Sequence, residues 1–272
     1  RWLVSGGDDG TVKVWDSRRP DRARNWVSVS TGHSGEVLCI APVGDGRRFV
    51  TGSWDETLKI WDLDSGACLR TLKGHTSWVN VVSPVGDGCR FVSGGEDGTV
   101  RVWAIDRNES IFTMSGHTFG VSSLAALGDS RRMVSGGRDK TVRVWDLSKG
   151  ICLWTMNGHA SQVVSVYVAR RGIISTCADG VAKLWDSADG RFIRTLTQNE
   201  TGGYNEGIPH RDDDRLDILE SSRLPSQNAV KHQLTRFLDA PVCRISLTRT
   251  KTGTCVAALA GGQAMDIFHM IE

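Results

Sequence analysis

Several features that would place a protein in a class at once are missing from this sequence. No apolar run approaches the roughly 18 residues that a membrane-spanning helix needs, and the longest ones, such as residues 255–260, are short. The 33 basic and 31 acidic residues give a formal net charge of +2, which creates no overall field that favours nucleic acid or a membrane surface. These absences predict a soluble protein whose net charge points to no class of partner.

Cysteines are few and have no metal-binding spacing. The chain has seven, an odd number, and no two of them form a Cys-x-x-Cys pair, so neither a disulfide framework nor a structural zinc site is indicated. A chain of 272 residues can also bury enough apolar surface to fold without such crosslinks. We therefore expect reduced thiols, no metal, no cofactor and an intracellular location, either cytoplasmic or nuclear.

Tyrosine, phenylalanine and proline are scarce, whereas glycine and tryptophan are abundant. The chain has 2 tyrosines, 7 phenylalanines and 6 prolines, but 31 glycines and 10 tryptophans. Because a repeated unit is the simplest cause of such a bias, internal periodicity has to be tested before other features are interpreted.

Two short markers recur at nearly constant spacing. The dipeptide Gly-His begins at residues 32, 74, 116 and 158, which are 42 residues apart. A tryptophan closes each unit and is followed by aspartate in every unit but one, where Ala104 follows. These tryptophans are Trp15, Trp61, Trp103, Trp145 and Trp185.

Between the markers, each unit alternates short apolar strands with polar, glycine-rich turns. Residues 91–103 predict a strand, a turn around Asp97 and a second strand with apolar residues at alternate positions. A third strand follows the tryptophan and a fourth follows Gly-His. Glycine supplies the positive φ that such turns require. Four antiparallel strands in about 40 residues are typical of one blade of a β-propeller.

Through its Gly-His openings, mid-unit aspartates and Trp-Asp closings, the sequence resembles the WD-repeat β-propeller family over residues 1 to about 197. The resemblance implies an all-β fold built of four-stranded antiparallel blades, with about six blades represented. The expected organisation is a partial blade at 1–30, complete blades at about 31–72, 73–114, 115–156 and 157–197, a flexible insertion at 198–240 and a degenerate last blade at 241–272. Because Arg1 opens directly into an expected strand, we also expect the chain to be a fragment of a longer product.

A second regularity connects four side chains in every complete unit. A serine or threonine lies four residues before the turn aspartate, and the tryptophan lies six residues after it. An indole N–H can donate to the hydroxyl, the hydroxyl to the imidazole, and the imidazole to the carboxylate. We predict that this relay fixes the outer loop of each blade to its inner turn, the role that the resemblance implies. The four sets are His33, Thr51, Asp55 and Trp61; His75, Ser93, Asp97 and Trp103; His117, Ser135, Asp139 and Trp145; and His159, Ser175, Asp179 and Trp185.

Serine, histidine and aspartate together also suggest a hydrolase, in which the histidine would activate the hydroxyl. A catalytic site does not normally repeat four times at fixed spacing, and here the hydroxyl lies within an expected strand instead of on an exposed turn. The sequence therefore predicts a structural network and no catalytic residue, and we expect the protein not to be an enzyme.

Trp54 and Trp78 lie outside this network. Trp54 comes directly before the turn aspartate of its unit, and Trp78 comes three residues after a Gly-His histidine. The resemblance implies that both positions surround the central opening on one face, where partners bind, and consecutive blades should bring the two indoles together. Exposed tryptophan beside charged groups is typical of interaction hot spots, although indoles lying flat over a neighbouring blade would also explain the pair. The equivalent positions, expected on the same rim, hold Asp8, Glu36, Glu96, Arg138 and Gln162.

The turns between the first two strands of each unit are rich in arginine, and the fold would place them on the opposite face. That face could attract acidic protein segments, anionic lipid or RNA, but nearby aspartates favour solvated structural turns at least equally. The arginines are Arg47, Arg48, Arg90, Arg131, Arg132, Arg170 and Arg171.

The sequence thus predicts a non-enzymatic protein-protein interaction scaffold that presents partner-binding loops on one face of a propeller. An alternative is a substrate-recognition or regulatory part of a larger multidomain protein or ubiquitin-ligase complex. A less favoured alternative is the binding of anionic lipid or RNA through the arginine-rich turns. The expected partners are other proteins or peptides.

Overall fold

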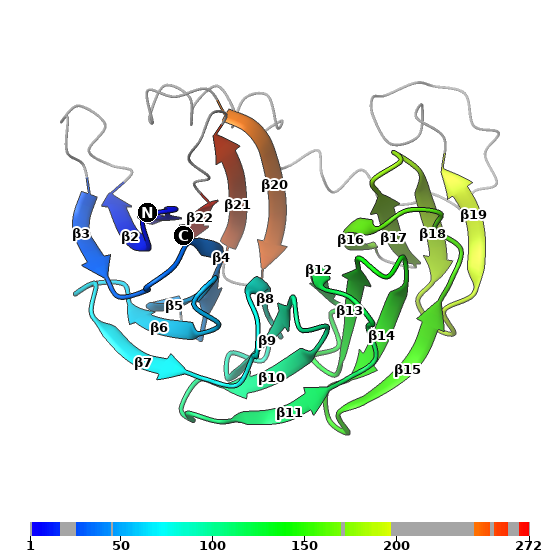
Figure 1. Ribbon diagram of the computed structural model, residues 1–272, viewed down its shortest axis with the longest axis horizontal. Helices are drawn as coiled ribbons and strands as arrows, with labels where there is room; N and C mark the ends of the chain where they lie inside the picture. The colour runs from blue at the N-terminus through cyan, green and yellow to red at the C-terminus, as the bar shows by residue number, and fades with distance from the viewer. Residues whose placement is uncertain are drawn as a thin grey trace.

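The computed structural model describes residues 2–16, 26–44, 46–169, 172–196, 242–250, 253–260 and 267–271. Every regular element in these ranges is a β-strand. None of the described residues forms a helix long and apolar enough to cross a membrane. The described strands form five four-stranded sheets and one two-stranded sheet. Figure 1 shows the four-stranded sheets arranged side by side around a common centre as blades of a propeller, which confirms the predicted fold class.

The first blade contains β22 (Ile267–Ile271), β1 (Trp2–Gly6), β2 (Thr11–Asp16) and β3 (Trp26–Thr31), in that order. The second contains β4 (Val37–Val43), β5 (Arg48–Ser53), β6 (Leu58–Asp62) and β7 (Cys68–Leu72). The third contains β8 (Val79–Pro84), β9 (Arg90–Gly95), β10 (Val100–Ala104) and β11 (Ser110–Met114). The fourth contains β12 (Val121–Ala126), β13 (Arg132–Gly137), β14 (Val142–Asp146) and β15 (Ile151–Met156). The fifth contains β16 (Val163–Ala169), β17 (Gly172–Cys177), β18 (Ala182–Asp186) and β19 (Phe192–Leu196).

The C-terminal strands differ from the degenerate last blade predicted at 241–272. β20 (Val242–Thr250) pairs with β21 (Gly253–Ala260) as a two-stranded sheet, whereas β22 pairs antiparallel with β1. The blade expected to be truncated therefore gains its innermost strand from the other end of the chain, and Figure 1 shows the two ends together. A short apolar strand carries no local signal for its partner, so the sequence did not show that β22 pairs with β1. The insertion predicted at 198–240 lies outside the described residues.

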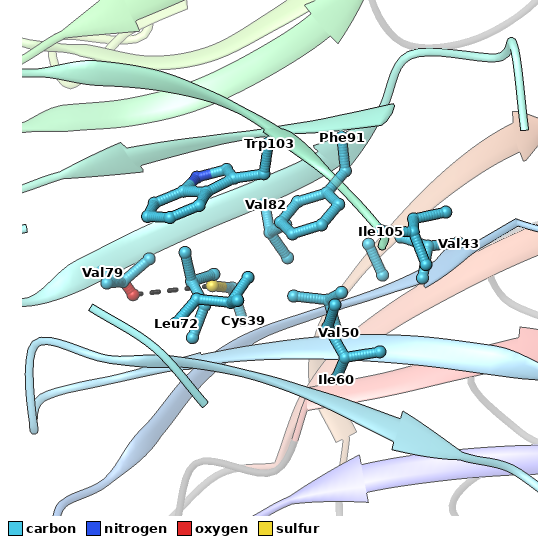
Figure 2. Close-up of a cluster of buried hydrophobic side chains, with 12 residues drawn as sticks. Cys39, Val43, Val50, Ile60, Leu72, Val79, Val82, Phe91, Trp103 and Ile105 are labelled. Carbon is cyan, nitrogen blue, oxygen red and sulfur yellow. Dashed lines mark hydrogen bonds between the residues drawn. The ribbon is translucent and has the colours of Figure 1, made fainter. Parts of the chain in front are cut away.

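Apolar side chains of neighbouring blades pack against each other to form the core. Between the second and third blades, Ile60 and Leu72 belong to one buried cluster with Phe91 and Trp103 (Figure 2). The rings of Phe91 and Trp103 stack at a centroid distance of 6.4 Å. Fully burying one such large side chain stabilises the fold by roughly 1.5–3 kcal/mol, so the alternating apolar residues of each strand join blade to blade.

Cys39 belongs to the same cluster and shows how a thiol is accommodated there. Its Sγ donates to the Val79 carbonyl of the next blade across 3.5 Å (Figure 2). Burial raises the pKa of this thiol to about 12, so it stays protonated and unreactive. Cys39, Cys68, Cys89, Cys152 and Cys177 are free of disulfides.

The innermost strand of each blade from the second to the fifth contains a β-bulge next to its first valine. The pairing shifts between Val37 and Cys39, between Val79 and Val81, between Val121 and Ser123, and between Val163 and Ser165. A bulge adds one unpaired residue and redirects its side chain. In the third blade this residue is Asn80, whose amide reaches a carboxylate on the rim described below.

Candidate functional site

The predicted relay is present in the second, third and fourth blades. In the fourth blade the Trp145 indole N–H donates to Ser135 Oγ across 2.7 Å, and Ser135 Oγ lies 2.6 Å from His117 Nε2. His117 Nδ1 lies 2.9 Å from Asp139 Oδ2. The equivalent contacts join Trp61, Thr51, His33 and Asp55 in the second blade, and Trp103, Ser93, His75 and Asp97 in the third.

The hydrogen-bond order requires a neutral histidine in one tautomer. Nδ1–H donates to the carboxylate, so Nε2 is left to accept from the hydroxyl, which itself accepts from the indole. Burial lowers the pKa of His33 and of His117, which favours this neutral form. Burial alone would raise the pKa of the Asp55 carboxyl, but hydrogen bonds from Thr57 and His33 hold that pKa below its ordinary value.

The fifth blade departs from the predicted relay. Trp185, Ser175 and His159 are joined as expected, but His159 Nδ1 lies 2.9 Å from Cys177 Sγ, and Cys177 Sγ lies 2.6 Å from Asp179 Oδ1. The sulfur therefore stands between the imidazole and the carboxylate. Asp179 is exposed, whereas its counterparts in the second to fourth blades are half-buried.

Two positions differ between the fourth and the fifth blade. Cys177 replaces Gly137, where an added Cβ would lie against His117 Nδ1. Ser53 holds this position in the second blade, but its Oγ donates to the Gly35 carbonyl and His33 still meets Asp55, so it is the sulfur of Cys177 that separates His159 from Asp179. Thr141, which donates to Asp139 Oδ1 across 2.8 Å, corresponds to Val181, which has no hydroxyl. The Cys177 thiol takes over that donor role, and burial together with the Asp179 carboxylate raises the pKa of the thiol.

The relay resembles a catalytic triad in its distances but not in its access. Thr51, Ser93, Ser135 and Ser175 each have an exposed fraction of 0%. A nucleophile must reach the substrate, and these hydroxyls lie beneath a tryptophan inside a strand. The geometry therefore supports a structural role for the relay. In the described part of the chain, no group of three or more histidine, cysteine, aspartate or glutamate side chains could hold a metal ion.

A repeated backbone contact places the predicted rim residues in pairs. The N–H of the residue before each turn aspartate donates to the carbonyl of the residue three positions after the Gly-His histidine. The pairs are Trp54 with Glu36 at 2.9 Å, Glu96 with Trp78 at 2.7 Å, Arg138 with Gly120 at 2.8 Å and Ala178 with Gln162 at 2.9 Å. These loops therefore lie at corresponding places in successive blades.

Trp54 and Trp78 stack on each other across the boundary between the second and third blades. Their ring centroids are 4.6 Å apart and their planes differ by 13°. Each tryptophan is nevertheless 40% exposed. The expected meeting of the two indoles is present, and it forms an aromatic surface, called here the tryptophan pair, that is both rigid and open to solvent.

A polar cluster adjoins the tryptophan pair on the side of the fourth blade. Arg138 Nη1 lies 2.8 Å from Glu96 Oε1, and the Asn80 amide donates to Glu96 Oε2 across 2.8 Å. Gly120 lies directly against this carboxylate. Both oxygens of Glu96 are thus bound, and the charge of Arg138 is paired.

Two rim residues were not predicted from the sequence. Phe119 is 65% exposed and precedes Gly120; the positions equivalent to Phe119 in other blades hold Gly35, Ser77 and Ser161, so aligning the units one residue earlier would have revealed it. Asn80 had no such signal, because its contact with Glu96 depends on the bulge.

On the opposite face, two of the predicted arginines connect neighbouring blades. Arg90 pairs with Asp87 at 2.6 Å and donates to the Ser130 carbonyl of the next blade across 2.9 Å. Arg132 pairs with Asp129 at 2.7 Å and donates to the Ser187 carbonyl across 3.1 Å. These contacts favour the structural interpretation of the turns. Arg170 and Arg171 lie outside the described residues.

Comparison with known proteins places the repeats in a family. The family described as WD domain, G-beta repeat matches residues 1–16, 25–62, 66–104, 108–146 and 150–186, which is more than half of the chain. The chain is also 45% identical over 60 residues to the guanine nucleotide-binding protein G(I)/G(S)/G(T) subunit beta-1 of Homarus americanus. That alignment covers 22% of this chain and only 16% of the relative.

These repeats support a role in protein interaction, and the family to which they belong is one of non-catalytic interaction domains. Each matched segment from residue 25 onward covers the outermost strand of one blade and the three inner strands of the next. The chain belongs to the WD repeat family.

Proposed function

We propose that the rim around the tryptophan pair is the surface through which this scaffold binds partner proteins. The observation that carries the proposal is the stacking of Trp54 on Trp78 with 40% of each residue left exposed. A large aromatic group usually becomes buried, and one that is held rigid in solvent can bind without losing much side-chain entropy.

The charged surroundings support the same surface. The Glu96 N–H donates to the Trp78 carbonyl, and the Glu96 carboxylate is bound by Arg138 and Asn80. Phe119 adds a third exposed ring in the corresponding loop of the next blade. An aromatic centre with a polar rim is the usual composition of an interaction hot spot.

Affinity purification with quantitative mass spectrometry tests this proposal. The tagged chain is compared with the double variant Trp54→Ala and Trp78→Ala, and with a control that carries Phe192→Ala and Ile193→Ala on the outer strand β19. Phe192 and Ile193 are 50% and 48% exposed, so the control removes a similar apolar surface elsewhere. Specific partners should fall at least tenfold with the first variant and persist with the control.

Thermal melting of the same proteins separates binding from folding. Because neither indole lies in the relay, the tryptophan variant should melt within a few degrees of the parent. If the double variant at Trp54 and Trp78 recovers the partners at parental levels, the proposed surface is refuted.

A second proposal is that the chain acts as a recognition or regulatory subunit of a larger assembly, such as a ubiquitin-ligase complex. It is supported by the similarity to a protein named as one subunit of a guanine nucleotide-binding protein. Size-exclusion chromatography of the native product with its co-purified proteins tests it. Migration at the mass of the single chain, with no co-eluting protein, would contradict it.

A further inference from the structure

We infer that the tryptophan pair binds a cationic side chain, arginine or lysine, of the partner protein. This inference deepens the proposed function and rests on it, because it names the chemistry that the same surface recognises.

The aromatic faces provide the first part of the argument. Stacking at 4.6 Å covers one face of each indole with the other ring, and 40% of each residue still meets solvent. The face of an indole is electron-rich, and it attracts an ammonium or guanidinium group held within about 6 Å of the ring centre. Tryptophan is the strongest of the natural side chains in this respect.

Acidic residues lie next to Trp54 on the side of the first blade. The Trp54 N–H donates to the Glu36 carbonyl across 2.9 Å, and the Val37 N–H donates to the Gly7 carbonyl across 3.2 Å. Glu36 therefore lies at the contact between the first two blades, directly beside Trp54. Glu56 follows Trp54 by two residues and is exposed. Glu36 and Glu56 are therefore the acidic residues next to Trp54, one across a backbone hydrogen bond and one in the same turn.

The opposite side of the pair does not offset this negative charge. The Glu96 N–H donates to the Trp78 carbonyl, so Glu96 lies beside the pair, but its carboxylate is already bound by Arg138 and Asn80. Arg138 is committed to the same pair, so it offers little attraction to an acidic ligand. The acidic residues next to Trp54, together with the compensated Glu96–Arg138 pair beside Trp78, favour a cation over an acidic or a nucleic-acid ligand at the indoles.

The test uses two pentapeptides that differ only in charge, acetyl-Gly-Gly-Arg-Gly-Gly-amide and the same peptide with citrulline in place of arginine. Citrulline has nearly the shape of arginine and carries no charge. Binding to the full 272-residue chain is followed through the indole N–H resonances in NMR titrations. The arginine peptide should bind about tenfold more tightly, and its affinity should fall as sodium chloride is raised.

Matched variants locate the effect. Trp54→Leu should reduce the affinity for the arginine peptide about tenfold, and Glu36→Gln should reduce it about threefold. Phe192→Leu, which removes an exposed ring on β19, should leave it unchanged. A citrulline peptide that binds as tightly as the arginine peptide, an affinity unchanged in Trp54→Leu, or no detectable binding of the arginine peptide at millimolar concentration would each overturn the inference.

The outcome is separable from that of the proposed function. If partner capture depends on Trp54 and Trp78 while the two peptides bind equally well, the proposed surface is supported and its specificity for a cation is refuted. If partner capture is independent of the two tryptophans, the proposed function itself falls.

Discussion

At the scale of single residues, the hydroxyl at the centre of each relay has the largest structural role for its size. Ser135 has an exposed fraction of 0% and contacts both Trp145 and His117. The Trp145 indole N–H and His117 Nε2 are both buried, and each depends on Ser135 Oγ for its hydrogen bond. Removing that oxygen leaves two buried polar groups without a partner, and that costs more than losing one favourable contact.

Replacing Ser135 with alanine should therefore lower the free energy of unfolding by roughly 2–4 kcal/mol. Urea denaturation followed by fluorescence measures the change. Ser148→Ala is the matched control, because Ser148 lies in an exposed turn of the same blade, where it donates to Asp146. The control should shift stability by less than about 1 kcal/mol. Equal effects of the two substitutions would mean that the relay contributes little.

Residue types in register were enough to predict the relay, but not its exception. Ser175 and Trp185 stand at the expected positions, and the sequence alone gave Asp179 the same role as Asp139. The exception arises at Cys177, whose sulfur bonds both His159 and Asp179, whereas Ser53 at the same position of the second blade leaves His33 in contact with Asp55. Whether a side chain fits between two others depends on distances of a few tenths of an ångström, which no spacing rule contains.

At the scale of elements, the strands and turns were predictable because the same pattern of apolar strands and polar turns recurs in each repeat. The strands of the second to fifth blades lie within the predicted ranges, which begin at about residue 31. Pairing between distant segments was not predictable in the same way. β22 has five residues with no repeat marker, and only the folded arrangement shows that its partner is β1.

The fifth blade should be stabilised by restoring the direct contact between His159 and Asp179. The double variant Cys177→Gly and Val181→Thr recreates the pattern of the fourth blade, in which Thr141 donates to Asp139 and the histidine meets the carboxylate. A hydrogen bond to a charged group replaces two weak bonds of the thiol, one accepted from His159 and one donated to Asp179, so we expect a gain of about 1 kcal/mol. Chemical denaturation and amide hydrogen exchange in β17 and β18 measure it.

The reciprocal variant provides the control. Gly137→Cys with Thr141→Val introduces the fifth-blade pattern into the fourth blade, where the new Cβ would lie 2.4 Å from His117 Nδ1. That variant should be less stable than the parent. A stabilised reciprocal variant would show that the sulfur-bridged arrangement is the better one.

At the scale of the whole molecule, the repeated relays make stability depend on pH in one direction. The pKa of His33, His117 and His159 is lowered mainly by burial. The folded state then binds fewer protons than the unfolded state, in which histidine has a pKa of about 6.5. This contribution is complete above about pH 6.5 and is lost as the pH falls below it.

The relay carboxylates act in the same direction at lower pH. The pKa of Asp55, Asp97 and Asp139 is lowered because hydrogen bonds outweigh the effect of burial. Their contribution is complete above the unfolded value of about 3.9 and decreases as the pH falls through the folded values. The melting temperature should therefore be level above about pH 7, decline from about pH 6.5, and decline more steeply below about pH 4.

Thermal melting between pH 8 and pH 3 checks this profile. The variant His117→Gln cannot be protonated, so its melting temperature should be lower overall but should change less between pH 7 and pH 5. A melting temperature that rises as the pH falls through this interval would show that the folded chain binds protons at its histidines.

The pairing of β22 with β1 also determines how the molecule responds to force. Trp2 lies opposite Ile271 at one end of this ladder, and Gly6 lies opposite Ile267 at the other. Tension between residues 2 and 271 would separate the strands one pair at a time, which requires little force. Tension between residues 2 and 267 would load the whole ladder in shear, so the same strand pair would yield easily in one geometry and resist in the other.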